Sequence, residues 1–569
     1  MVYKDIEIYG VDKNSQFTEG WMCPIYKKGK RELIENYRPI TLLNSDYKIS
    51  TKEKAIRLAK AAPNCIHKNQ AGFMPGRDIR NQVRLARLMV HYDEATKQNG
   101  LLIALDQEKT YDKITHDYLL CALETYNFLE SFQKTVKFLY ENVETSVMIN
   151  GVLSQPFNVT RGVRQGNPLS HLLFNIVIEP LANLLQQSRD LKGFQIPGET
   201  QRLIVTMFTD DTTAYLAEQD NPDHLWKILD TWCIASGAKF NSKKTKIIPI
   251  DTQKFREQVI QQRRTNEAMQ TLDENIKILQ EKEAAHILGG WIRNSISDEA
   301  VWPKSIDKVK NYFKRWGKSN PAIFRRRLII QMFGGGAIQY LAAVQGMPNQ
   351  VVKTYQKMIS KFIWDGKKKA INKTHLLTPL KKGGIHLLYI QARNEAIEIM
   401  WMKKYLDTSN NRPLWANIAD ALIENSIADS NKIDDKLAVN MFLQDWKPCL
   451  THRSKLPPDL KRMISVVKLY GVSLEALALP EKVKRNLPIW YQLGLDKLPN
   501  SLMRRKLTKC LKRSHEAVKV GDLIKLMECL NQTNPRDTHQ DLQNCQCAPC
   551  EKDRTEGCKN PNACIRAAE

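Results

Sequence analysis

The sequence has no uninterrupted apolar run of the roughly 18 residues that a membrane-spanning helix needs. The best candidate, LLFNIVIEPLANLL, is interrupted by Asn175, Glu179 and Asn183. The first ten residues, MVYKDIEIYG, lack the charged segment followed by an apolar one that is typical of a secretory signal. We therefore expect neither a membrane partner nor a secretory leader.

Negative charge is scarce. The chain has 86 Lys and Arg residues against 61 Asp and Glu residues, a formal charge of +25. Such an excess is typical of proteins that bind a polyanion, most often nucleic acid. Cations stand beside aromatic rings in YFKRWGK (312–318), FRRR (324–327), FIWDGKKK (362–369) and LMRRK (502–506). This mixture suits phosphates and unpaired bases, although a merely soluble basic protein remains the alternative.

Cysteine is sparse over most of the chain, where seven of the 12 cysteines are scattered and indicate reduced, intracellular thiols. The other five crowd the C-terminal tail in a C-x-C-x2-C-x7-C-x5-C series: Cys545, Cys547, Cys550, Cys558 and Cys564. Four of these five could hold a tetrahedral Zn²⁺ in a knuckle that grips single-stranded RNA. A disordered thiol-rich tail is the alternative.

The pattern of apolar residues predicts an α+β region followed by mainly helical domains. A chain of 569 residues is too long for one core, so three or four folding units are expected. Helices are predicted at 81–96, 116–142, 222–236 and from Pro168 or Ser170 onward. Strand-like segments are LLIALD (101–106) and TSVMINGVL (145–153), the latter with an Asn-Gly turn at 150–151. Residues 251–285 are strongly charged and predict a solvated excursion, and 298–540 is mainly helical.

Two adjacent aspartates, Asp210 and Asp211, interrupt the strand-like stretch VTMFTDDTTAYL. Strand interiors disfavour Asp, and adjacent carboxylates repel. The flanks predict a hairpin with the pair at its tip, although that tip lacks the usual glycine. A chance pair is the alternative, as in the polar segment KIDDKL.

A third carboxylate, Asp106, ends the strand-like LLIALD. A strand end and a hairpin tip can bring three carboxylates to one edge of a sheet, which suits hard divalent ions. Two such ions can activate a hydroxyl and stabilise a leaving phosphate, and in a basic chain this predicts phosphoryl transfer on nucleic acid.

Several motifs resemble, in order and spacing, those of reverse transcriptases from LINE-type, non-LTR retrotransposons. They are YKKGKRELIENYRPITLLNSDYKISTK, QAGFMPGRDIRN, ALDQEKTYDKI, RGVRQGNPLSHLLFNIVIEPL, FTDDTTAYL, SGAKFNSKKTKI, ILGGWI and FIWDGKKKAINKTHLLTPLKKGGIHLL, which span about 20–390. The resemblance implies a right-hand polymerase: fingers (1–99), palm with primer-grip hairpin (100–297), thumb and post-thumb basic segment (298–400), a helical region (401–540) and a Cys-rich tail (541–569).

The resemblance also implies the roles of individual residues. Asp106, Asp210 and Asp211 would bind two Mg²⁺ ions, and Lys244 would help pyrophosphate to leave. Tyr111 would be the gate that crowds the 2′ position of the sugar, although a core tyrosine is equally compatible with the sequence. Template and nucleotide would contact Arg164, Gln165, Gly166, Arg38 and Arg77, and the primer grip would be Gly289, Gly290 and Trp291.

Four positions depart from the family pattern: Thr110 and Thr209 replace Ala, Asn167 replaces Asp, and His171 replaces Pro. None removes a metal ligand, but together they suggest drift. We therefore keep a catalytically inactive remnant that only binds nucleic acid as the alternative function. A group II intron maturase fits less well because of the WDGKKK segment.

The resemblance implies an RNA-directed DNA polymerase that extends a primer 3′-hydroxyl. Its partners would be an RNA template, a DNA primer or target and deoxynucleoside triphosphates. No endonuclease motif precedes the fingers motifs, so the sequence suggests a piece truncated at both ends. The expected location is the nucleus, with assembly of a ribonucleoprotein in the cytoplasm.

Overall fold

The computed structural model describes residues 2–12, 15–96, 98–141, 143–267, 269–292, 298–365, 367–427, 433–451, 454–472, 479–493, 506–528 and 539–569. Contacts divide the chain into two compact units, Met1–Ser297 and Asp298–Glu569. Each unit is described by itself.

The first unit is built around a five-stranded sheet, the palm sheet, with strand order β10-β9-β3-β8-β7. Its strands are β10 (Lys277–Ile278), β9 (Lys246–Ile250), β3 (Gly100–Leu105), β8 (Asp211–Ala217) and β7 (Val205–Phe208). The central strand β3 pairs antiparallel with β8 on one side and β9 on the other. The predicted strand and hairpin are therefore confirmed as neighbours.

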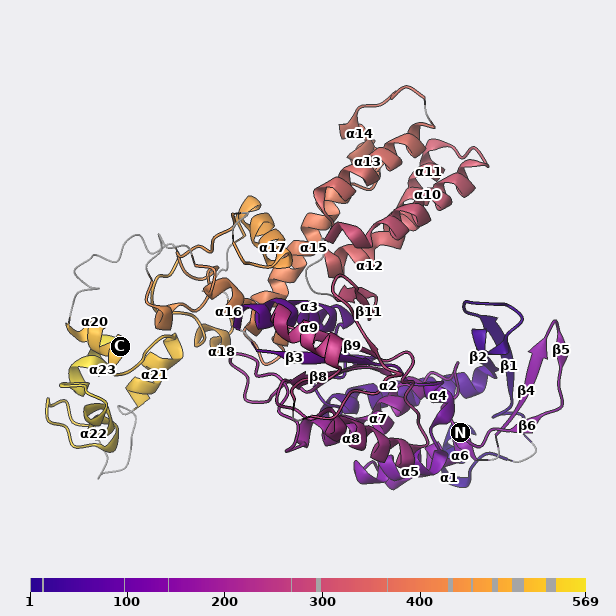
Figure 1. Cartoon of the computed structure of the whole chain (residues 1–569), viewed down its shortest axis with the longest axis horizontal. Coiled ribbons are helices and arrows are strands. Elements are labelled where there is room, and N and C mark those ends of the chain that lie inside the picture. The colour runs from indigo at the N-terminus through magenta and orange to yellow at the C-terminus, as the bar shows by residue number, and fades with distance from the viewer. Residues whose placement is uncertain are drawn as a thin grey trace. The chain divides into compact units, whose positions relative to one another are not determined.

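Helices cover both faces of the palm sheet, which explains why β3 is apolar throughout rather than alternating. Leu101, Ile103 and Leu105 join the main core with α7 (Ser170–Gln187) and α8 (Pro222–Ser236), whereas Leu102 does not belong to that cluster. Figure 1 shows α3 (Ile79–Thr96) and α9 (Gln253–Gln262) across the sheet from α7 and α8. The other helices of this unit are α1 (Val2–Tyr9), α2 (Ser45–Cys65), α4 (Thr110–Lys113), α5 (His116–Thr125) and α6 (Glu130–Tyr140), with a 3-10 turn η1 (Ile34–Asn36).

A second sheet, the fingers sheet, has strand order β2-β1-β4-β5, with β6 also on β4. Its strands are β2 (Tyr37–Leu43), β1 (Gly20–Tyr26), β4 (Glu144–Ile149), β5 (Val152–Leu153) and β6 (Phe157–Asn158). β1 runs antiparallel to β2 and parallel to β4. The turn between β4 and β5 is Asn150–Gly151, both with positive φ, as the sequence predicted.

The prediction of a solvated excursion at 251–285 is wrong. Phe255 and Val259 on α9, and Leu272, Ile276 and Ile278 beyond it, are buried in the main core. Strand β10 in this segment extends the palm sheet by pairing with β9. The apolar residues are few but periodic, so the high charge of the intervening residues concealed a helix and a strand.

The second unit is helical. Its elements are η2 (Asp298–Val301), α10 (Pro303–Gly317), α11 (Ile323–Ile329), the π-helical η3 (Ile330–Gly335), α12 (Gly336–Gln345), α13 (Asn349–Trp364), α14 (Lys373–Leu377), η4 (Leu380–Lys382), α15 (Ile390–Tyr405), α16 (Leu414–Glu424), η5 (Asp435–Leu437), α17 (Pro458–Leu469), α18 (Glu481–Lys484), α20 (Lys506–Arg513), α21 (Val520–Met527), α22 (Ala548–Thr555) and α23 (Pro561–Ala568).

One continuous helix, Ile323–Gln345, is long and apolar enough by length and composition to cross a membrane. Within its apolar window, 44% of the residues are buried inside the structure. Ile330 and Ile338 lie in the core that α10 and α13 also form. Its apolar character is therefore accounted for by packing, and the feature is weak evidence for a membrane.

A buried carboxyl, Glu179 of α7, links the palm core to the segment after α2. Its Oε1 accepts the backbone N–H of His67 at 2.8 Å, and its other oxygen has no hydrogen-bond partner among the described residues. Burial raises the pKa of Glu179 to about 8, against the smaller opposing effects of that hydrogen bond and of Arg77. The side chain therefore keeps its proton near neutral pH.

We expect Glu179→Gln to remove one component of the pH dependence of stability. The folded carboxyl holds its proton up to about pH 8, whereas the unfolded one releases it near 4.5. Stability is therefore fully present below about pH 4.5 and declines by up to about 1.4 kcal/mol per pH unit as the pH rises between the two values. The melting temperature of the wild type, measured from pH 5 to 8, should fall relative to that of Glu179→Gln. Parallel curves would show that Glu179 is ionised in the fold.

Candidate active site and thiol clusters

A two-residue turn presents the aspartate pair. β7 and β8 pair with Phe208 opposite Asp211, so Thr209 and Asp210 form the turn. Thr209 has a φ of 59°, a left-handed conformation that is uncommon for a β-branched residue. Gln70 holds it: its side chain accepts the Thr209 N–H at 2.8 Å and donates to the Thr209 carbonyl at 3.3 Å. A carboxamide from another segment thus stabilises a turn that lacks the usual glycine.

Asp106 reaches the same edge of the palm sheet. In the antiparallel pair β3–β8, Leu105 lies opposite Thr212, and continuing this register by one residue places Asp106 beside Asp211. Thr110, at the start of α4, donates its hydroxyl to Asp210 Oδ2 at 3.2 Å. The structure therefore brings the three sequence-predicted carboxylates together.

The turn N-S-K-K-T explains the position of Lys244. The Asn241 N–H donates to the Asp106 carbonyl at 2.7 Å, and the Asn241 side chain accepts the Lys244 N–H at 3.2 Å. The Lys244 ammonium then lies 3.6 Å from Asp106 Oδ2 while most of its side chain stays exposed. An asparagine turn anchored on the strand thus carries the cation to the carboxylates.

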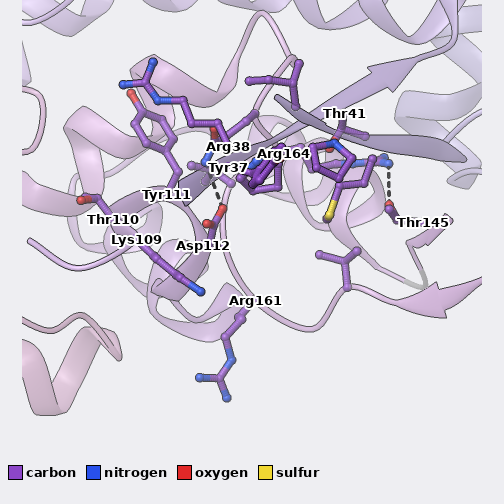
Figure 2. Close-up of a pocket in the computed structure, with 18 of the residues that line it drawn as sticks. Tyr37, Arg38, Thr41, Lys109, Thr110, Tyr111, Asp112, Thr145, Arg161 and Arg164 are labelled. Carbon is purple, nitrogen blue, oxygen red and sulfur yellow. Dashed lines mark hydrogen bonds between the residues drawn. The ribbon is translucent and has the colours of Figure 1, made fainter. Parts of the chain in front are cut away.

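The three carboxylates, Thr110 and Lys244 line one cavity of about 1170 Å³ between the palm and fingers sheets. Of the sequence-predicted residues, its lining includes Asp106, Asp210, Asp211, Lys244, Tyr111, Arg38, Arg164 and Gln165. Figure 2 shows part of this wall, with Arg38, Lys109, Tyr111 and Arg161 around the opening. This volume lies just above the range of about 300–1,000 Å³ that is usual for ligand pockets.

The carboxylates repel one another electrostatically. Partial desolvation, followed by the charges of Asp210 and Asp106, raises the pKa of Asp211 to about 6, although the residue as a whole is exposed. Asp106 Oδ2 is buried and has no hydrogen-bond donor among the described residues. Burial and the neighbouring cations Arg38, Lys28 and Lys244 lower the pKa of Lys27 on the facing wall. A concentrated negative site with an unsatisfied oxygen is an arrangement that a cation relieves.

Tyr111 both packs and faces the cavity. Its ring stacks on Phe174 of α7 with centroids 4.9 Å apart, and its side chain is half-buried. Burial, with the Asp210 charge adding to it, raises the pKa of its hydroxyl. The two readings of the sequence are compatible, because one face of the ring packs and the residue still lines the cavity.

The loop Arg164–Gly166 mainly contacts the fingers sheet and the residues just before it. The buried Arg164 guanidinium donates to the Thr18 carbonyl and to the Thr145 hydroxyl, the latter contact being the dashed line that ends at Thr145 in Figure 2. The Gln165 carbonyl accepts the Thr41 N–H at 2.8 Å. At Gly166, where φ is 120°, a Cβ would lie 2.3 Å from the Thr41 carbonyl oxygen. Arg164 is therefore turned into the protein, and Gly166 permits a close approach of backbones.

Arg77 is not brought to the cavity. Its guanidinium donates to the carbonyls of Ile66, His67 and Gln70 after the end of α2. These contacts order the segment that carries Gln70 and thereby the aspartate turn. Arg38 of β2, in contrast, is exposed on the cavity wall.

The predicted primer-grip residues form a hairpin of β11 (Ala285–Ile287) and β12 (Gly290–Ile292). Leu288 and Gly289 both have positive φ, which is typical of a two-residue hairpin turn. Trp291 packs edge-to-face against His286 at 4.9 Å. Gly289, Gly290 and Trp291 lie outside the lining of the cavity.

Comparison with known proteins agrees with this geometry. Residues 25–290 match the family model described as reverse transcriptase (RNA-dependent DNA polymerase). An uncharacterized 149 kDa protein of transposon TX1 from Xenopus laevis is 27% identical over 88% of this chain. The Pol polyprotein of type-1 retrotransposable element R2 from Popillia japonica is 28% identical over 40% of it.

Residues 25–290 are a reverse transcriptase domain of the LINE type. The chain spans 36% of the length of the Xenopus relative and 31% of the Popillia one. Among solved structures, telomerase from Candida albicans matches with a TM-score of 0.35 and 12% identity, over 75% of this chain and 65% of that one.

The four departures from the reverse transcriptase pattern have structural contacts in this chain. Thr110 donates to Asp210, and Thr209 forms the clamped turn. Asn167 donates to the Tyr47 hydroxyl at 3.2 Å, which an aspartate could not do. His171 packs on Phe73 with ring centroids 4.6 Å apart. These contacts give the departures a place in the fold, and the inactive alternative is not favoured.

Sequence reasoning missed three basic residues that line the cavity and also missed Gln70, which holds the aspartate turn. Lys27, Lys109 and Arg161 line the wall with Arg38 and Lys244. Lys109 was visible within ALDQEKTYDKI, three residues after Asp106. Gln70 lies in QAGFMPGRD, and its role is evident only from its hydrogen bonds with Thr209, which is distant in the sequence.

The five tail cysteines do not form one site. Cys545, Cys547 and Cys550 gather with His539, and Cys558 and Cys564 gather with Cys510 and His515. Within each group the ligand atoms lie within 4.8 Å of one another. The prediction of four ligands chosen from the five cysteines is corrected to two groups, because the tail folds back on α20 and each group recruits a histidine.

The basic-aromatic segments after residue 300 divide into core and surface. Phe313 and Phe362 stack in the core with centroids 4.5 Å apart, whereas Trp316 and Phe324 are exposed. Arg326 is buried and donates to the carbonyls of Pro321 and Phe362, and it pairs with Asp365 at 2.9 Å. The expectation that all three arginines of FRRR face nucleic acid is wrong for Arg326. In LMRRK, residues 502–505 lie outside the described residues.

We expect Arg325 and Arg326 to respond oppositely to alanine substitution. Arg325 is exposed, so Arg325→Ala should reduce the slope of log affinity against log salt by about 0.7 on single-stranded RNA without changing the melting temperature. Arg326→Ala should lower the melting temperature, because it removes buried hydrogen bonds, and should leave the slope unchanged. Filter binding at several salt concentrations and thermal melts measure both. If Arg326→Ala reduced the slope of log affinity against log salt more than Arg325→Ala does, this division would be contradicted.

Proposed function

We propose that this chain is an RNA-directed DNA polymerase that extends a primer 3′-hydroxyl on an RNA template. The observation that carries the proposal is the meeting of Asp106, Asp210 and Asp211 at one edge of the palm sheet, beside a large basic-walled cavity in a reverse transcriptase domain. The substrates would be deoxynucleoside triphosphates. This activity belongs to the proposal because the chain spans only part of its curated relatives.

The residues present fit a pair of Mg²⁺ ions. Asp106 Oδ2 accepts no hydrogen bond within the described protein, and the raised pKa of Asp211 shows that Lys244 and Lys27 only partly offset the negative charge of the three carboxylates. Carboxylate oxygens are the ligands that Mg²⁺ prefers. Bound there, the ions would activate the attacking hydroxyl and stabilise the leaving phosphate.

The chain's own residues would prepare these ligands and guide the leaving group. Thr110 and the clamped Thr209 fix the direction of Asp210. Lys244 is exposed at the rim of the carboxylates, where its ammonium can neutralise the charge that accumulates on departing pyrophosphate. Tyr111 would lie under the incoming sugar and exclude a 2′-hydroxyl by its bulk.

Template, primer and location complete the proposal. The facing wall supplies Lys27, Arg38, Lys109 and Arg161, which suit phosphates of the nucleotide and the template. A DNA primer or target, nuclear action and cytoplasmic ribonucleoprotein assembly are proposed from the retrotransposon family.

We also propose zinc in the C-terminal tail, held by His539, Cys545, Cys547 and Cys550. His539 Nδ1 lies 3.5, 3.6 and 3.4 Å from the three sulfur atoms. One ring nitrogen cannot share a single proton equally among three sulfurs. A tetrahedral zinc with bonds of about 2.3 Å to sulfur and 2.0–2.1 Å to nitrogen gives nitrogen–sulfur separations of about 3.6 Å.

Asp210→Asn should abolish primer extension with Mg²⁺ while RNA binding stays close to the wild-type value. The change removes a carboxylate charge and keeps the shape, so the fold and the basic wall persist. Asp434→Asn, at an exposed aspartate outside the cavity lining, is the matched control and should extend normally. Equal loss of extension and RNA binding in Asp210→Asn would assign this aspartate to folding instead.

Tyr111→Ala should raise ribonucleotide incorporation relative to deoxynucleotide incorporation. It should also lower stability, by up to about 3–5 kcal/mol, because the ring loses its contact with Phe174. Tyr111→Phe keeps the ring and should keep both properties. Incorporation rates for both sugars and a melting curve on the same preparation test this. A destabilised Tyr111→Ala enzyme with unchanged sugar preference would refute the gate.

A further inference from the structure

The second thiol group lies between elements far apart in the sequence. Cys510 belongs to α20 and His515 follows that helix, whereas Cys558 precedes α23 and Cys564 lies within it. Their four ligand atoms lie within 4.8 Å of one another. The spacing of four residues between Cys510 and His515, and of five between Cys558 and Cys564, is typical of paired zinc ligands.

The printed geometry of this group fits a metal. Cys558 Sγ and Cys564 Sγ are 3.7 Å apart. Two sulfurs bound to one tetrahedral zinc at about 2.3 Å lie about 3.8 Å apart, whereas a disulfide requires about 2.05 Å. Both cysteines are almost completely buried, at 2% and 1% exposure. The separation of the two sulfur atoms therefore fits two thiolates that share one metal ion and does not fit a disulfide bond.

His515 supplies an independent indication. Its Nε2 is buried and has no hydrogen-bond partner among the described residues, while its Nδ1 lies 3.5 Å from Asp553 Oδ1. A zinc-bound histidine characteristically has its second nitrogen on a carboxylate, which fixes the tautomer and the ring orientation. An unpartnered buried nitrogen on the other side of the ring would otherwise cost about 1–3 kcal/mol.

We infer that the C-terminal region holds a second zinc ion, bound by Cys510, His515, Cys558 and Cys564. This site is separate from the one proposed at His539, Cys545, Cys547 and Cys550 and does not depend on polymerase activity. It fastens α20 to α23 across an interval of more than forty residues.

The two sites brace each other through shared helices. α22 carries Cys550 of the first site and Asp553, which holds His515 of the second. α23 carries Cys564 of the second site and Asn562, whose side-chain oxygen accepts from His539 of the first at 3.2 Å. Each metal therefore orients a ligand of the other.

The weak apolar core of this region explains the need for both ions. α20, α21, α22 and α23 have eight residues each, shorter than the about 12–15 residues of a marginally stable isolated helix. The buried cluster around Cys558 and Cys564 contains Leu437, Trp490 and Leu511 as its other buried members. Metal bonds would supply the free energy that so small a core lacks.

Zinc content of the purified full-length chain tests this inference. We expect two zinc ions per chain in the wild type and in Cys121→Ser, an exposed cysteine outside both groups. Cys510→Ser and His515→Ala should each retain one, as should Cys545→Ser, which removes a ligand of the other site. A wild type with one zinc, or a Cys510→Ser chain that still holds two, would overturn the second site.

Two further measurements separate loss of a ligand from loss of the fold. His515→Cys should keep two zinc ions, because four thiolates also bind zinc tetrahedrally. Cobalt substituted for zinc should give a thiolate-to-metal absorption band in Cys510→Ser of half the wild-type intensity, since each site has three thiolates. If Cys510→Ser loses both zinc ions and His515→Cys also loses zinc, the variants are misfolded and the second site is refuted.

A titration of free thiols tests the alternative of a disulfide. Under denaturing, oxidant-free conditions it should find all 12 cysteines reduced, and a Cys558–Cys564 disulfide would also refute the inference.

Discussion

The geometry of the sheet edge that carries the three aspartates depends on one side chain, the carboxamide of Gln70. Thr209 occupies a left-handed conformation that costs a β-branched residue on the order of 1–3 kcal/mol. Gln70 bonds both the N–H and the carbonyl of Thr209 and also accepts the Gly72 N–H at 2.9 Å. At Gly72 a Cβ would lie 2.3 Å from the Thr209 hydroxyl oxygen, so only glycine allows this approach. Because the clamp fixes the turn, Asp210 points toward the cavity before any ligand arrives.

The clamp is itself anchored, which ties the active site to the core. The segment around Gln70 runs along β7, where Ala71 and Gln82 both donate to the Met207 carbonyl. Arg77 then orders the preceding turn by donating to three carbonyls. Arg77, which the family pattern assigns to template and nucleotide, is therefore used to hold backbone. A reverse transcriptase needs this rigidity because its ligands must be preorganised within about half an ångström.

The predictable part of the structure was the part in which local pattern and tertiary environment agree. The buried strand β3, the helix α7 and the hairpin around Asp210 could be read from apolar periodicity and turn residues. The segment 251–285 could not, because its few core residues, such as Phe255 and Ile278, are separated by charged ones. The roles of Arg77 and Arg326 were hidden for a different reason. The sequence of a basic motif does not distinguish an arginine that faces solvent from one that is buried against backbone carbonyls.

The site shows the same division. Asp106, Asp210 and Asp211 were identifiable because carboxylates at strand ends have few structural uses. The thiol groups were not, because their pairing depends on how the tail folds against α20, and His515 and His539 carry no signal in isolation. The spacing predicted a metal site in the tail but could not predict which side chains gather into each group.

The parallel pairing of β1 with β4 has a consequence for how this chain acquires its structure. Gly20 of the first strand lies beside Thr145, more than a hundred residues later, and β3, which Asp106 follows directly, lies between them in the sequence. During synthesis from the N-terminus, β1 therefore waits for this neighbour until after β3 has emerged. The fingers sheet and Asp106 consequently belong to one cooperative folding unit, and a fragment that ends near residue 99 would leave an open edge of β1 available to other chains.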